Sequence, residues 1–65
     1  MPAAEAFEAS IDQSDGAIEV WVGKGERAVS ILVEDGGGRA SVSVPPPRVR
    51  RLILDLQEAL RRLED

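Results

Sequence analysis

The chain has 65 residues, a formal charge of −4, no cysteine and no histidine. Its length allows one small domain, covering residues 1–65, that buries only about 60% of the surface its unfolded form exposes. Such small folds usually need disulfides, a metal or a second subunit for stability. Disulfides are excluded here, and a structural zinc site lacks its usual ligands. We therefore expect a homodimer.

The charge balance also limits the class of partner. Twelve acidic against eight basic residues disfavour tight non-specific binding to nucleic acid or anionic membranes. No stretch is long and apolar enough to span a bilayer. The start, Met1 to Glu5, has neither region of a signal peptide, so we expect a cytoplasmic protein. The absence of Thr, Asn, Tyr, His and Cys indicates a GC-rich bacterial, archaeal or phage source.

The N-terminal stretch supports two interpretations. The Ala and Glu content of residues 2–10 favours a helix, for which Pro2 suits the first turn. Phe7, Ala9 and Ile11, however, alternate with polar residues at strand period. We expect a strand over residues 7–13 and leave residues 1–6 as a segment that can be disordered.

Three further alternating stretches follow, over residues 17–22, 27–34 and 39–44. They are separated by the turn pairs Asp15-Gly16, Lys24-Gly25 and Gly36-Gly37. The pattern predicts an antiparallel meander of three or four strands over residues 7–44. One face of this sheet gathers the apolar side chains, which are Ile18, Val20, Val22, Val29, Ile31, Val33, Ala40, Val42 and Val44.

Two-residue turns at these pairs fix the predicted register. The second and third turns place Val20 opposite Val29 and Glu34 opposite Arg39, both favourable pairs. The first turn places Ile11 opposite Val20 but Asp12 opposite Glu19, a like-charge pair that counts against this hairpin.

The last third of the chain predicts one amphipathic helix over residues 46–63, started by Pro45-Pro46-Pro47. Its apolar stripe is Val49, Leu52, Ile53, Leu56, Leu60 and Leu63. The stripe would pack on the apolar sheet face, giving a two-layer α+β domain. Leu54 lies outside the stripe, where it is either simply exposed or in contact with a second chain.

The charges of this helix run against its dipole. Arg48, Arg50 and Arg51 crowd the first turns, whereas Glu64 and Asp65 close the C-terminus. The arginines are either a solvated basic turn or, with Arg61, a contact for an anion, a nucleic acid or carboxylates of a neighbouring chain. Two i,i+4 pairs are expected on the surface, Arg51 with Asp55 and Glu58 with Arg62.

The outer face of the predicted sheet is a more informative candidate site than the apolar face. Trp21 and Leu32 lie there among four small residues, Ala28, Ser30, Ser41 and Ser43. This platform could be the centre of a homodimer, where aromatic anchors are enriched. It could instead be covered by residues 1–10, be a stacking surface for a base, or bind another protein.

No catalytic motif in the sequence rises above background. There is no histidine base and no cysteine nucleophile. The glycines around Lys24 and Gly37 do not form a phosphate loop, because neither run has a Gly-Lys-Ser/Thr ending or opens a helix. The carboxylate pairs Asp12 with Glu19 and Glu34 with Asp35 are expected by chance. We expect no enzyme activity, no cofactor and no metal.

These observations leave three hypotheses. The first is a small non-catalytic module that forms a homodimer and binds another protein. The second is a nucleic-acid binder, because four strands followed by a helix resembles, in order of elements, the single-strand-binding transcriptional coactivator fold; a helical N-terminus would instead resemble a double-stranded-RNA-binding domain. The third is an enzyme subunit without its own active site.

Overall fold

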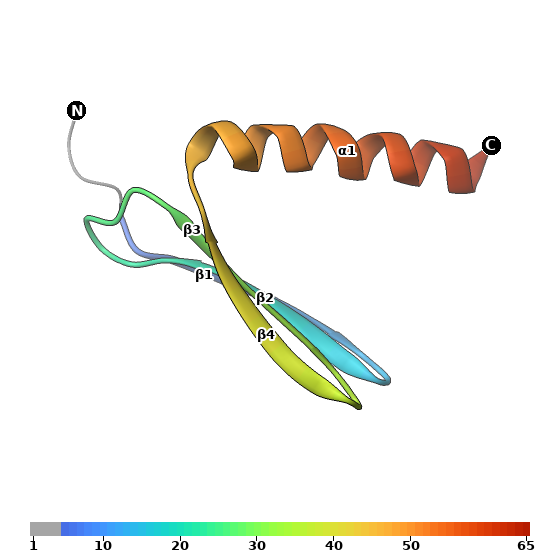
Figure 1. Ribbon diagram of the computed structural model, residues 1–65, viewed down its shortest axis with the longest axis horizontal. Coiled ribbons are helices and arrows are strands. Elements are labelled where there is room, and N and C mark those ends of the chain that lie inside the picture. Colours follow the sequence, from blue (N-terminus) through green and yellow to red (C-terminus); the bar gives the residue numbers. More distant parts are fainter. Residues whose placement is uncertain (1–4) are drawn as a thin grey trace.

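In the computed structural model, which describes residues 5–65, a four-stranded sheet is followed by one helix (Figure 1). The elements are β1 (Phe7–Gln13), β2 (Gly16–Val22), β3 (Val29–Asp35), β4 (Gly38–Val44) and α1 (Pro46–Glu64). The strands are antiparallel in the order β1-β2-β3-β4. The fold class is therefore the predicted small α+β meander with a C-terminal helix. What was predicted for residues 1–4 lies outside the described residues.

The hairpin of β3 and β4 has the predicted register. Gly36 and Gly37 form its turn, and the backbone N–H of Gly37 donates to Asp35 Oδ1 at 2.7 Å. Glu34 stands opposite Arg39, and their side chains form an ion pair at 3.7 Å. Asp35 thus stabilises the turn, because its side chain accepts a hydrogen bond from the backbone N–H two residues later in the chain.

The hairpin of β2 and β3 is shifted from the predicted register. Val20 pairs with Ile31 instead of Val29, because the turn at Lys24-Gly25 lies within a longer connection, residues 23–28, and does not join the two strands directly. The N–H of Glu26 donates to the carbonyl of Gly23 at 2.9 Å. Gly25 has φ +80°, the conformation that a type II turn demands at its third position.

The first hairpin is shifted in the same way. Its turn is Ser14-Asp15 and not Asp15-Gly16, so Ile11 faces Ile18. Asp12 then faces Ala17, and the predicted repulsion with Glu19 does not arise. Both shifts amount to two residues, which is an even number, so every side chain keeps its predicted face.

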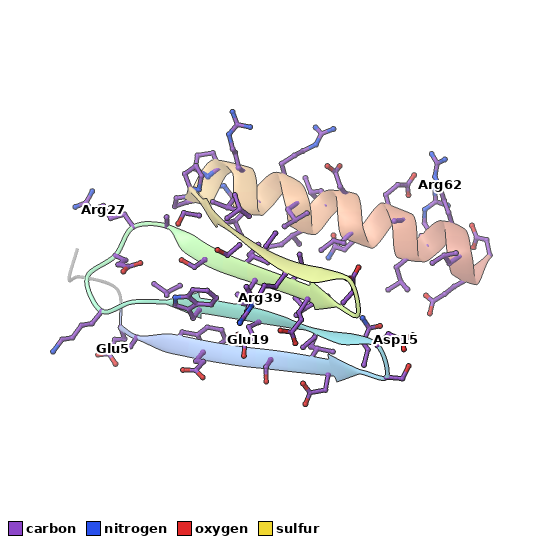
Figure 2. The ribbon with its side chains drawn as sticks, turned by 60° about the horizontal axis from the view of Figure 1, so that its bottom comes forward. Glu5, Asp15, Glu19, Arg27, Arg39 and Arg62 are labelled. Atoms are coloured by element: carbon purple, nitrogen blue, oxygen red, sulfur yellow. The ribbon has the colours of Figure 1, made fainter. Side chains whose placement is uncertain are left out.

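The sheet therefore has an inner, apolar face and an outer, polar face. By register, the inner face carries Phe7, Ala9, Ile11, Ile18, Val20, Val22, Val29, Ile31, Val33, Ala40, Val42 and Val44. The outer face includes Glu19 and Arg39, which lie in front of the strands in Figure 2, on the side turned from the helix. Helix α1 lies on the inner side.

Prolines set the start of α1. Pro45 is the N-cap in an extended conformation, and Pro46 and Pro47 occupy the first two helical positions, where a missing N–H costs nothing. The carbonyl of Pro45 accepts from the N–H groups of Arg48 and Val49, both at 3.0 Å. No side chain caps this end, so the rigid prolines alone define where the helix begins.

The helix does not close over the sheet. It leaves β4 near the left of Figure 1 and diverges from the strands toward its C-terminus. Val49 is half-buried, Leu52 is 37% exposed, and Leu63 is 85% exposed. No side chain is fully buried among residues 5–65. The radius of gyration is 13.6 Å, against about 11 Å for a compact domain of this length.

Candidate interaction surfaces

The predicted outer-face platform is assembled by three strands. Trp21 of β2 stands opposite Ser30 of β3, and Ser30 stands opposite Ser43 of β4. Leu32 stands opposite Ser41, one pair further along and diagonal to Trp21. Trp21, Ser30 and Leu32 are half-buried, whereas the two β4 serines are exposed. These five predicted residues therefore share one face.

Two predicted members lie elsewhere. Ala28 precedes β3 at the end of the connection from β2 and is half-buried. Leu54 is 61% exposed on α1, a different element on the other side of the sheet. The outer platform and Leu54 therefore do not form one continuous surface within a single chain.

The observed register adds acidic neighbours that the predicted register did not place there. Glu8 of β1 stands directly opposite Trp21, and Glu19 stands opposite Leu32. A shallow hollow beside Trp21 is lined by Ala6, Phe7, Glu8, Trp21, Val22 and Gly23. The shift of the first hairpin brings Glu8 to the tryptophan, and the like-charge pair of Asp12 and Glu19 was the sequence signal against the predicted register. Its carboxylate disfavours a phosphate-bearing ligand at this spot.

Most of the exposed large apolar side chains lie on the inner face of the sheet and on the helix. Nine large apolar side chains are between 37% and 85% exposed there, four on the inner sheet face and five on the helix stripe. We call these the open apolar surface: Phe7, Ile11, Val33, Val42, Leu52, Ile53, Leu56, Leu60 and Leu63. Large contiguous apolar patches mark interaction sites on soluble proteins. The sequence pattern predicts an apolar sheet face and an apolar helix stripe, but it also predicts that the two pack on each other.

The basic residues of α1 divide into paired and unpaired groups. Arg51 bonds Asp55 at 3.1 Å, and Arg61 bonds both Glu58 at 2.7 Å and Asp65 at 3.2 Å. Arg62, which points away from the sheet in Figure 2, lies 3.5 Å from Glu58. The two expected i,i+4 pairs are thus present.

Arg48 and Arg50 form no ion pair within residues 5–65, and neither does Glu64. The predicted anion-contact group consists of Arg48, Arg50, Arg51 and Arg61. Within this group, Arg48 and Arg50 are the two whose charge is free for another molecule.

Two groups on the helix, Glu58 and Arg61, have shifted pKa values. The hydrogen bonds from Arg61 lower the pKa of Glu58 below its usual value of 4.5, with a smaller contribution from Arg62. The same contact raises the pKa of Arg61. Both groups are exposed, so the shift reports a surface ion pair and not a catalytic environment.

The acidic side chains of residues 5–65 form no candidate metal site. No group of three or more Asp, Glu, His or Cys side chains among residues 5–65 could hold a metal ion. Asp12 and Glu19 are not opposite each other, while Glu34 is paired with Arg39 and Asp35 supports a turn. The one helix found in residues 5–65 does not have the length and apolarity needed to cross a membrane.

No family model, curated protein or solved structure matches the chain. Its function must therefore be argued from its own surfaces.

Proposed function

We propose that the protein is a small non-catalytic interaction module of the cytoplasm that works as a homodimer and binds another protein. The observation that carries the proposal is the open apolar surface, because a monomer would leave its nine side chains between 37% and 85% exposed. Burying a large apolar side chain contributes roughly 1.5–3 kcal/mol. A single chain does not gain the full burial free energy of these side chains.

The exposed area supports a second subunit. The chain has an accessible surface of 5664 Å², whereas a compact protein of its mass exposes about 4,000 Å². This excess of accessible surface is larger than the roughly 800 Å² that each partner buries in a standard interface. An obligate dimer would also compensate for the small hydrophobic core that a chain of this length can form.

The outer platform suits the second partner. In a dimer that uses the open apolar surface, Trp21 and Leu32 remain available on the opposite side of the sheet. A half-buried tryptophan beside small serines is the kind of anchor that protein interfaces enrich. The flanking Glu8 and Glu19 favour a partner segment that brings positive charge.

Thermal unfolding tests the dimer. For a folded dimer in equilibrium with unfolded monomers, the midpoint rises with protein concentration. We expect circular dichroism at 222 nm, recorded from about 2 to 200 µM chain, to show this rise. A cooperative midpoint that is the same at every concentration would contradict the proposal.

A second candidate function is binding of single-stranded nucleic acid. The element order of four strands and one helix, together with the unpaired Arg48 and Arg50, favours it. The acidic residues beside Trp21 speak against stacking there. A labelled oligonucleotide at low salt separates the candidates, because affinity that falls with salt and is lost in R48E/R50E would support nucleic-acid binding. The alternative order with an N-terminal helix is wrong, since residues 7–13 form β1.

A further inference from the structure

We infer that α1 is the dimer interface, and that two copies of α1 pack antiparallel with a two-fold axis at Leu56. This inference rests on the proposed homodimer and specifies its geometry. It places the interface on the open apolar surface and not on the predicted platform of Trp21 and Leu32.

The sequence of the stripe is symmetric about Leu56. Apolar residues stand three, four and seven positions to either side of it: Ile53 and Ala59, Leu52 and Leu60, Val49 and Leu63. An interface built on a two-fold axis presents the same patch from both subunits, so residue i meets j and j meets i. Antiparallel helices centred at Leu56 satisfy this at every apolar position, pairing Leu52 with Leu60, Val49 with Leu63 and Ile53 with Ala59 of the second copy.

The same arrangement explains the reversed charges of the helix. Arg48 and Arg50 stand near the N-terminal end, against the helix dipole, and have no ion-pair partner among the described residues. Antiparallel pairing centred at Leu56 brings Arg48 to the level of Glu64 of the second copy, which also has no ion-pair partner among residues 5–65, whereas Arg50 comes level with Arg62. Each C-terminal end likewise approaches the positive N-terminal end of the other helix. Arg48 and the two helix dipoles are therefore unfavourably placed in one chain and favourably placed in two.

The geometry of the chain leaves room for a second helix. Exposure of the stripe rises from Val49, which is half-buried, to Leu63 at 85%, because the helix and sheet diverge. The far half of the stripe therefore has no cover within its own chain. The 19 residues of α1 span about 28 Å, enough for an interface of four apolar layers.

Engineered cysteines test the pairing, because the chain has none of its own. L56C is expected to form a disulfide dimer under mild oxidation, since its two copies meet at the axis. L54C, on the opposite side of the same helix, is the matched control and should stay mostly uncrosslinked. Chains carrying L52C mixed with chains carrying L60C should crosslink with each other far more than either does alone. A parallel pair would instead crosslink L52C with itself and overturn the inference.

Sedimentation of L56E and L54E gives the second readout. L56E removes one buried leucine from each subunit and opposes two carboxylates at the axis, so we expect the dimer to dissociate at least about 100-fold more readily. L54E should dimerise like the parent chain. A parent chain that is monomeric overturns the proposed homodimer itself. A parent dimer that survives L56E and dissociates in W21A or L54E overturns only the helix interface.

Discussion

Replacing Gly16 with alanine tests the register on which both surfaces depend. Gly16 opens β2 opposite Asp35 of β3. A Cβ atom added there would overlap the backbone carbonyl oxygen of Glu34. A backbone atom cannot relieve this overlap by a rotamer change, as a side chain could. Inserting a methyl group into such a tight contact typically costs about 1–3 kcal/mol. The whole chain is expected to have a stability of roughly 3–10 kcal/mol, so this loss is large.

Urea unfolding followed by Trp21, the single tryptophan, measures the effect. With a slope of about 1 kcal/mol per molar urea, the G16A midpoint should fall by on the order of 1 M at fixed protein concentration. The control is G36A, whose Cβ would meet nothing within 4 Å and whose φ is not positive. We expect it to match the parent or be slightly more stable. G16A as stable as G36A would refute the close approach of β2 and β3.

Three further predictions address the surfaces. W21A should lose binding to the partner protein while its sedimentation as a dimer is unchanged, and a partner captured equally well by W21A would remove the platform's role. E64R should weaken the dimer by about twofold to fivefold per ion pair, and R48E in the same chain should restore it at low salt; no recovery would argue against antiparallel helices. Glu58 should titrate below 4.5 by NMR and return toward that value in R61Q. Because the pKa of Glu58 is depressed in the folded chain, its stabilising effect is present above 4.5 and is lost as pH falls through the lower folded value.

Sequence alone predicts most of the fold because alternation and turn residues constrain it locally. Asp35 and the glycines after it determine the third turn, so the register of β3 with β4 is correct. The register of β2 with β3 was predicted two residues away, because Gly25 suits a type II turn within a longer connection as well as a tight hairpin. The register of β1 with β2 was also two residues away, because the turn lies at Ser14-Asp15 and not at Asp15-Gly16. The face of each side chain was still correct, since an even shift preserves it.

The orientation of α1 could not be predicted in the same way. The stripe from Val49 to Leu63 matches the inner sheet face in chemistry, so complementarity alone predicts that they cover each other. Pro45, Pro46 and Pro47 fix the direction in which the helix leaves β4, and that direction carries Leu63 away from the strands. No periodicity in the sequence encodes this angle. The candidate dimer surface consequently moves from the Trp21 platform to the helix.

Sedimentation equilibrium of the unmodified chain tests most directly whether a second copy covers the open apolar surface. Across about 1 to 100 µM the account predicts a species of twice the chain mass of 7.0 kDa, dissociating only at the lowest concentrations. A single species at 7.0 kDa throughout, folded by circular dichroism, would contradict it.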